Sequence, residues 1–224
     1  MKIFIIGGTG LLGYEAAKQL VNEGHEVSSL SLSCKAEDYE GMQLIEGNYL
    51  TMTENEIREV LTGYDAFIFA TGKDERVKLT SDPYQFFKHH NILPLERWLS
   101  IGKECGVKHA VVLGSYYAYF ARVFAELEMS KHHPYIRSRI VQSEVALSFA
   151  DSDFNVSVLE IPFVFGTQEN REPLWTFLVE RIMNMKDVTF YPVGGTTMVT
   201  ARQVGEAISG VIGKNGLFPI GYYN

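Results

Sequence analysis

The first thirteen residues constrain the fold of this 224-residue chain more than any other segment. An unbroken apolar run at 3–6 predicts a strand buried on both faces, and residues 11–23 have the periodicity of an amphipathic helix. Between them glycine recurs at every third position, and glycine lets a backbone turn tightly and approach a pyrophosphate at a helix start. This context is the one that a dinucleotide-binding turn requires. We expect the cofactor to contact Gly7, Thr9, Gly10, Leu11, Leu12 and Gly13.

Short apolar runs and helical segments alternate along the rest of the chain. We expect further strands at 25–32, 42–46, 65–70, 107–113 and 156–161, and helices at 53–61, 84–105 and 134–149. Pro94 should kink or divide the second of these helices, because proline lacks a backbone N–H. The alternation implies right-handed crossovers and a parallel sheet. The predicted fold class is α/β, a Rossmann-like doubly wound parallel sheet with a small C-terminal substrate-side subdomain.

After residue 162 the regular alternation of strands and helices ends. We expect a loop at 166–173, helices at 174–185 and 201–212, a short strand at 188–191 and a strand without a partner at 217–222. We therefore assign residues 1–164 to a dinucleotide-binding domain and 165–224 to a small substrate-binding region. Within that region, the helix at 200–213 is expected to pack back on the first domain.

Composition narrows the class of protein. The formal charge is −7, whereas a nucleic-acid binder usually carries a basic excess. Two cysteines, Cys34 and Cys105, exclude a disulfide scaffold and a cysteine-rich zinc site. No apolar run approaches the roughly 20 residues of a membrane span, and the first run is too short for a signal peptide. We expect a cytoplasmic protein without a metal, a membrane or a nucleic acid as partner.

The end of the strand at 25–32 bears on the choice of dinucleotide. An NAD site usually has an acidic residue there, which binds the ribose 2′-hydroxyl. Here Ser31, Ser33 and Lys35 follow instead, and they could hold a 2′-phosphate, although no arginine accompanies them. The alternative is that these serines only end a strand. We predict NAD(P) as cofactor, with a slight preference for NADP.

Together these segments resemble the extended short-chain dehydrogenase/reductases, also called the NAD-dependent epimerase/dehydratase family. The glycine turn looks like the family's glycine motif, and 46–50 resembles the segment that contacts the adenine. The segments 69–72 and 159–166 lie where the family lines the cofactor and the nicotinamide. The resemblance covers nearly the whole chain, although family members are commonly longer, so we expect a truncated or compact member. It implies cofactor contacts from Asn48, Tyr49, Ala70, Thr71, Gly72, Pro162 and Val164.

The same resemblance implies the catalytic residues. Ser115 ends a strand as the family's catalytic serine or threonine does, and Tyr135 and Arg139 match its Tyr-x-x-x-Lys helix. Asn91 falls at the family's helix asparagine. A tyrosine whose pKa is lowered from about 10 can move a proton near neutral pH, and a cation at i+4 favours the tyrosinate. The alternatives are a packing tyrosine, a serine that ends a strand and an ordinary surface asparagine.

Three departures from the family pattern leave a second hypothesis open. Arg139 replaces the lysine and cannot relay a proton, while Glu160 and Gln203 stand where arginine and aspartate are usual. The first hypothesis is an NAD(P)-dependent oxidoreductase, epimerase or dehydratase that transfers hydride at a hydroxyl or carbonyl carbon, with Tyr135 as general acid/base. The alternative is a non-enzymatic NAD(P)-binding redox sensor.

Substrate and assembly are expectations of the same kind. The family suggests a small-molecule substrate such as a nucleotide-sugar. Arg171 and Arg181 could bind its anionic group or could be ordinary surface arginines. The family also implies a homodimer through the helices at 84–105 and 134–149.

Overall fold

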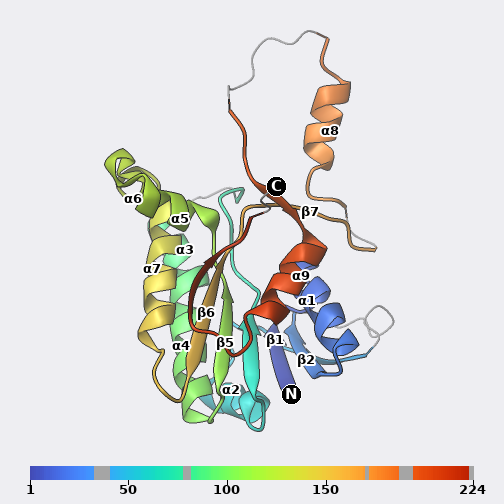
Figure 1. Cartoon of the computed structure of the whole chain (residues 1–224), viewed down its shortest axis with the longest axis vertical. Coiled ribbons are helices and arrows are strands. Elements are labelled where there is room, and N and C mark those ends of the chain that lie inside the picture. The colour runs from blue at the N-terminus through green and yellow to red at the C-terminus, as the bar shows by residue number, and fades with distance from the viewer. Residues whose placement is uncertain (33–40, 78–81, 170–171, 187–193, 222–224) are drawn as a thin grey trace.

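A seven-stranded parallel sheet forms the centre of the protein (Figure 1). The computed structural model describes residues 1–32, 41–77, 82–169, 172–186 and 194–221. The strands run in the order β3-β2-β1-β4-β5-β6-β9, and every neighbouring pair is parallel. Their bounds are β1 Lys2–Ile6, β2 Glu26–Ser31, β3 Met42–Glu46, β4 Ala66–Phe69, β5 His109–Leu113, β6 Asn155–Glu160 and β9 Gly216–Pro219. The Rossmann-like doubly wound sheet predicted from the sequence is confirmed.

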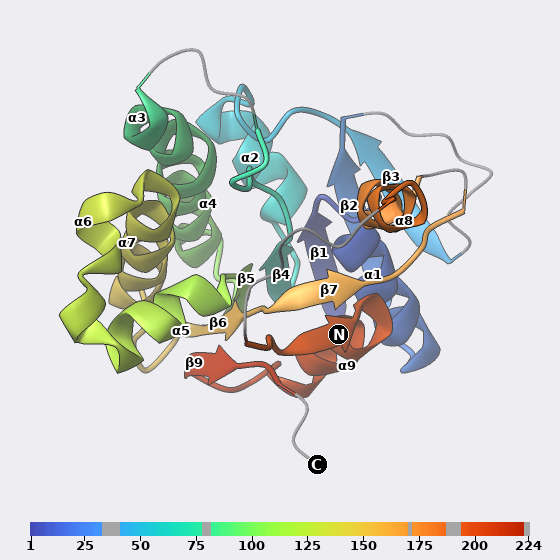
Figure 2. The same cartoon turned by 90° about the horizontal axis from the view of Figure 1, so that it is seen from above.

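Helices cover both faces of the sheet, as the view from above shows (Figure 2). One face packs against α1 Leu11–Asn22 and α9 Ala201–Gly210, and Ile3 and Ile5 of β1 point into this core. The other packs against helices that include α2 Glu54–Leu61, α4 Leu93–Glu104 and α7 Pro134–Ser148. Phe4 and Ile6 of β1 point into that second core. Successive strand residues face opposite cores, which explains the unbroken apolar run.

The helix expected at 84–105 is divided into three parts. They are α3 Pro83–Phe87, a π-helical turn Lys88–Ile92 and α4. Pro94 is the second residue of α4, a position where a helix loses no hydrogen bond to proline. The division expected from Pro94 is therefore found just before it, as the π-helical turn between α3 and α4.

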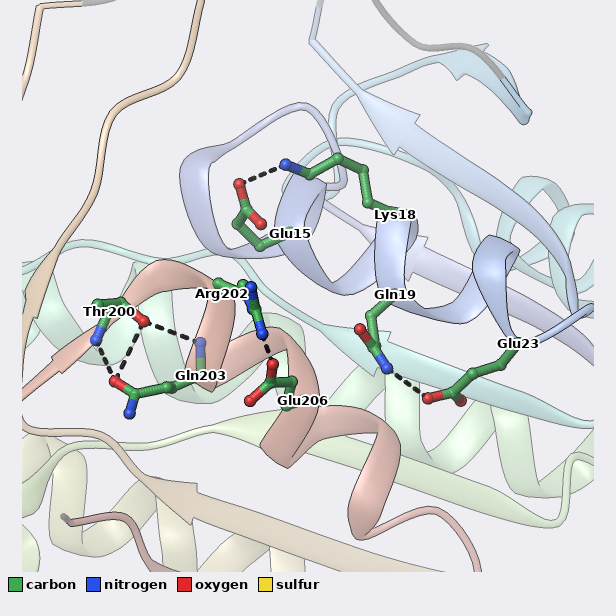
Figure 3. Close-up of polar contacts among 8 residues, drawn as sticks. All are labelled: Glu15, Lys18, Gln19, Glu23, Thr200, Arg202, Gln203 and Glu206. Carbon is green, nitrogen blue, oxygen red and sulfur yellow. Dashed lines mark hydrogen bonds and ion pairs between the residues drawn. The ribbon is translucent and has the colours of Figure 1, made fainter.

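The C-terminal part closes one edge of the sheet. The strand expected to lack a partner is β9, which pairs with β6 from Ser157↔Gly216 to Glu160↔Pro219. The helices α9 and α1 are in close contact because Gly205 packs directly on the α1 backbone. A Cβ on Gly205 would stand 2.8 Å from the backbone carbonyl oxygen of Glu15. Figure 3 shows polar contacts along these two helices, including Arg202 Nε to Glu206 Oε1 at 2.9 Å.

A hydrogen-bonded chain through His109 fixes the turn before β9. The Gly213 N–H donates to His109 Nδ1 at 2.6 Å, and His109 Nε2 lies 3.2 Å from Ser157 Oγ. Ser157 Oγ donates to the Lys214 carbonyl at 2.8 Å. This arrangement requires a neutral imidazole with its proton on Nε2, because Nδ1 accepts a backbone N–H. Burial accordingly lowers the pKa of His109 to about 4.

Several short elements near the carboxyl ends of the strands were not predicted. They are α5 Tyr116–Val123, α6 Met129–His132 and a two-stranded parallel pair of β7 Phe163–Phe165 with β8 Met198–Thr200. The predicted helix at 174–185 is α8 Thr176–Met183. The predicted strand at 188–191 lies outside the described residues. No described helix is long and apolar enough to cross a membrane.

Candidate active site

A cleft of about 820 Å³ opens at the carboxyl ends of β1, β4, β5 and β6. In an open parallel sheet this is the edge where ligands bind. The predicted site residues that line it are Gly7, Thr9, Gly10, Leu11, Leu12, Ser31, Tyr49, Ala70, Thr71, Gly72, Ser115, Tyr135, Arg139, Pro162 and Val164. Gly13, Asn48 and Asn91 do not line it, and Ser33 and Lys35 lie outside the described residues.

The glycine turn holds the backbone in a form that only glycine fits. Gly7 has a φ of +92°, and a Cβ on it would stand 2.9 Å from the Ala70 oxygen. A Cβ on Gly13 would stand 2.3 Å from the Gly7 oxygen, so Gly13 serves close packing of α1 on the turn. The Gln168 Nε2 donates to the Thr9 carbonyl at 3.0 Å and ties this turn to the loop after β7.

The start of α1 presents unpaired N–H groups to the cleft. Gly10 precedes the helix without a side-chain capping bond, and Leu11 and Leu12 line the cleft. The first N–H groups of an α-helix have no partner within the helix, and they attract anions. The turn therefore fits a pyrophosphate in both shape and charge.

Near β2, the predicted contact of Asn48 with the cofactor is not supported by the position of its side chain. Its Oδ1 accepts the Leu50 N–H at 3.0 Å, so the amide closes a turn instead of facing the cleft. Ser31 lines the cleft, and its hydroxyl lies 3.2 Å from that of Ser29. Tyr49 also lines the cleft, and its hydroxyl donates to the His90 carbonyl at 3.3 Å.

Ser115, Tyr135 and Arg139 meet on one wall of the cleft. All three are buried, with exposed fractions of 5%, 6% and 7%. The Ser115 hydroxyl lowers the pKa of the Tyr135 hydroxyl, and the Arg139 guanidinium carbon lies 5.7 Å from the centre of the Tyr135 ring. Arg139 Nη2 donates to the Leu113 carbonyl at 2.7 Å, which fixes the cation at the end of β5. The structure thus brings Ser115 to Tyr135 and Arg139, which lie 20 and 24 positions further along the sequence.

The electrostatics at Tyr135 differ from the expectation. Burial raises the pKa of the Tyr135 hydroxyl, and it outweighs the lowering by Arg139. The negative charges of Glu75 and Asp74 raise the pKa further. The predicted lowering of the Tyr135 pKa is therefore wrong for the protein without ligands. Burial destabilises the tyrosinate more than the nearby Arg139 cation stabilises it.

Asn91 lies beneath the cleft instead of in it. The side chain is fully buried in the π-helical turn, and its Oδ1 accepts the Lys73 N–H at 2.7 Å. Its Nδ2 donates to the Lys73 carbonyl at 2.9 Å. Asn91 thus holds both backbone groups of one residue in the loop after β4, and it acts on the cleft through that loop.

Sequence reasoning missed the charged loop after β4. Lys73, Asp74, Glu75 and Arg76 all line the cleft, and Arg76 forms an ion pair with Asp74. The available signal was a run of four charged residues directly after a buried strand. Among the described residues, no group of three or more histidines, cysteines and acidic side chains could hold a metal ion.

Two of the three departures from the family pattern have structural roles. Glu160 is fully buried, and both of its oxygens accept hydrogen bonds of 2.6 Å from Arg122 of α5. Gln203 belongs to the capping box of α9, in which Thr200 Oγ1 accepts the Gln203 N–H at 3.2 Å (Figure 3). Each side chain therefore has a structural role at its own position.

Comparison with known proteins identifies the family. A model of the NAD dependent epimerase/dehydratase family matches residues 3–199. The chain belongs to this family. Its members are enzymes that use NAD, so the resemblance inferred from the glycine turn and the Ser115 and Tyr135 segments is confirmed. A search of curated proteins by sequence finds no match.

Solved structures of such enzymes share the fold of this epimerase/dehydratase-family chain. MoeE5 in complex with UDP-glucuronic acid and NAD is 16% identical with a TM-score of 0.76, covering 100% of this chain and 77% of that one. UDP-N-acetylglucosamine 4-epimerase from Bacillus cereus is 15% identical with a TM-score of 0.74, covering 100% and 80%. The NAD-dependent NDP-hexosamine 5,6-dehydratase TunA is 18% identical with a TM-score of 0.76, covering 100% and 76%.

Proposed function

We propose that this chain transfers hydride at a hydroxyl or carbonyl carbon of a small molecule with NAD(P), as an oxidoreductase, epimerase or dehydratase. The observation that carries the proposal is the meeting of Ser115, Tyr135 and Arg139 in the cleft that also contains the glycine turn. A carbonyl–alcohol conversion needs a proton donor or acceptor at the substrate oxygen, and the Tyr135 hydroxyl in this cleft supports that role.

Each of the three side chains has a distinct part. Tyr135 exchanges the proton with the substrate oxygen through its hydroxyl, as general acid or base. Ser115 orients that oxygen with its own hydroxyl, which also lowers the pKa of Tyr135. Arg139 supplies positive charge beside the tyrosine ring but relays no proton, because a guanidinium does not lose one in proteins.

A dinucleotide fits the remaining part of the cleft. The glycine turn and the start of α1 suit the pyrophosphate, while Thr71, Pro162 and Val164 line the path from the turn to Tyr135. When bound, the nicotinamide supplies or accepts the hydride. NADP as the preferred form stays a prediction that rests on Ser31, Ser33 and Lys35.

Thermal unfolding with NAD, NADH, NADP and NADPH tests the cofactor. A ligand at 100 times its dissociation constant stabilises a protein by about 2.7 kcal/mol, roughly 5–10 °C for a chain of this size. A larger shift with the phosphorylated pair supports NADP. A larger shift with the other pair contradicts that preference, and no shift with any of the four contradicts the dinucleotide site.

Tyr135→Phe tests the catalytic role. We expect turnover to fall at least about a hundredfold, while the dinucleotide still shifts the unfolding temperature. Tyr119→Phe is the matched control, because Tyr119 lies on α5 outside the cleft lining. Unchanged turnover in Tyr135→Phe contradicts the proposal. Binding without turnover across a broad panel of substrates supports the redox-sensor alternative.

Substrate, assembly and location complete the proposal. Nucleotide-sugars are candidate substrates, because MoeE5 binds UDP-glucose and UDP-glucuronic acid in its solved structures. We further infer a homodimer through residues 84–105 and 134–149, for which light scattering should give twice the chain mass. A cytoplasmic location stays a prediction from the sequence.

A further inference from the structure

Five aromatic side chains form a continuous wall on the substrate side of the cleft. We call Tyr116, Tyr117, Phe163, Trp175 and Phe177 the aromatic wall, and all five line the cleft. Successive ring centres lie 4.6 Å apart between Tyr117 and Tyr116, and 5.5 Å between Tyr116 and Phe163. They lie 5.5 Å apart between Phe163 and Trp175, and 6.2 Å between Trp175 and Phe177. At its inner end, the Tyr117 ring is 6.3 Å from that of Tyr135.

Two hydrogen bonds to backbone carbonyls hold the wall in place. Trp175 Nε1 donates to the Val164 carbonyl at 2.7 Å, which holds the indole against β7. The Tyr116 N–H donates to the Ile161 carbonyl at 3.0 Å, and this bond anchors the start of α5 to the end of β6. Because these rings are positioned before any ligand arrives, a flat partner would lose little ordering free energy on binding to them.

The residues around the wall are apolar or aromatic. Among the described residues, the lining contributed by α5, β7 and α8 contains no lysine or arginine. Arg181 of α8 does not line the cleft, and Arg171 lies outside the described residues. The described cations elsewhere in the cleft are Lys73, Arg76, which is paired with Asp74, and Arg139, which donates to the Leu113 carbonyl beside Tyr135. Along the wall itself, the described residues offer a ligand ring stacking instead of charge.

We propose that the substrate of this site is a carbonyl compound or alcohol that carries an aromatic or flat apolar ring next to its reacting carbon. The proposal rests on the proposed function and narrows its substrate class. Stacking on the wall would leave the reacting carbon near Tyr135, since the wall ends at that ring. In reduction, the carbonyl carbon receives hydride from reduced nicotinamide. The oxygen takes the Tyr135 proton, and an alcohol and oxidised nicotinamide result.

Binding to the cofactor-loaded protein tests this class independently of turnover. The probes are 1-tetralone, a ketone fused to an aromatic ring, and UDP-glucose, each titrated by calorimetry. We expect 1-tetralone to bind more tightly than UDP-glucose. Tighter binding of UDP-glucose, or no saturable binding of 1-tetralone, overturns the proposal.

Variants of the wall give the second arm of the experiment. Phe163→Leu and Trp175→Leu should each weaken 1-tetralone binding about tenfold, because each removes one stacking ring. Phe124→Leu is the control, because Phe124 is an exposed ring at the end of α5 that does not line the cleft. An unchanged dissociation constant in both wall variants overturns the proposal.

The Tyr135→Phe variant separates this proposal from the proposed function. It keeps the ring that ends the wall and loses only the hydroxyl, so 1-tetralone should still bind, with a dissociation constant within about tenfold of the wild-type value. Retained turnover in that variant contradicts the role of Tyr135 in the proposed function and leaves the aromatic wall untouched. Loss of 1-tetralone binding in it contradicts the wall as the binding surface.

Discussion

At the scale of single residues, Tyr135 shows how burial and charge oppose each other. Removal from water raises the pKa of its hydroxyl, and the Arg139 cation works in the other direction. The family pattern has lysine at position 139, so the arginine keeps the charge but changes its shape. The guanidinium is held at the Leu113 carbonyl, which makes it a fixed charge with no part in proton movement.

Replacement of Arg139 should change the pH dependence of catalysis. In Arg139→Met the burial of Tyr135 is unopposed, so its pKa rises. Alcohol oxidation needs Tyr135 as the tyrosinate, so the acidic limb of kcat/KM for this reaction should then move to higher pH. Arg139→Lys restores a cation and should return the limb towards its original position. A pH–rate profile measures both variants, and a limb that stays in place in Arg139→Met contradicts the electrostatic role.

His109 predicts a second pH effect, on stability. Its pKa is about 4 in the folded state against an ordinary value of 6.5, so its stabilising contribution is complete above pH 6.5. The contribution is lost as pH falls from 6.5 towards 4, because the unfolded chain then binds a proton that the folded chain excludes. Between pH 7 and pH 5 we expect a loss of about 2 kcal/mol.

Urea unfolding at the two pH values measures this loss. His109→Asn removes the titrating group and should reduce the difference between pH 7 and pH 5, whereas the exposed His89→Gln should leave it unchanged. An equal pH dependence in wild type and His109→Asn would show that other groups are responsible.

At the scale of elements, one ion pair joins α5 to β6. Glu160 ends β6 and is fully buried, while the Arg122 side chain is 41% exposed. Both bonds measure 2.6 Å, the bidentate geometry in which arginine binds a carboxylate most firmly. Since α5 begins directly after Ser115, this pair also holds the helix that starts at the predicted catalytic serine.

Removal of Arg122 should destabilise the fold more than removal of both partners. Arg122→Met leaves a buried carboxylate without a counter-charge and should cost about 3 kcal/mol in unfolding free energy. The double variant Arg122→Met with Glu160→Met removes the unpaired charge and should recover most of that loss. A double-mutant cycle in denaturant measures the coupling. If the double variant is less stable than Arg122→Met, the buried charge is not the cause.

At the scale of the whole molecule, local sequence patterns predicted the sheet and the glycine turn. They did not predict ion pairs and strand pairs between residues far apart in the sequence. The apolar run at 3–6 and the glycines at 7, 10 and 13 act within a few residues, so their interpretation needed no tertiary knowledge. The partner of Glu160 lies 38 residues away, and the pairing of β9 depends on an edge left open by β6. The aromatic wall joins α5 to β7 and α8, and no periodicity links those segments.

The candidate site was also predicted only in part, where its residues follow a local sequence pattern. Ser115, Tyr135 and Arg139 follow a recognisable pattern, and the structure brings them to one wall. Asn48 and Asn91 were assigned by position alone, and their amides serve loop backbones instead. An amide can bind a ligand or a backbone equally well, so sequence position does not decide between the two.

The packing of α9 on α1 has a consequence for synthesis. A bond between Ser209 and Glu23 spans 186 residues, and Gly205 rests on the α1 backbone. During synthesis, the side of α1 that packs on α9 therefore stays uncovered until α9 has been made. Contacts of such long separation slow folding and leave apolar surface open for longer. The nascent chain is most open to aggregation and to capture by chaperones during this interval.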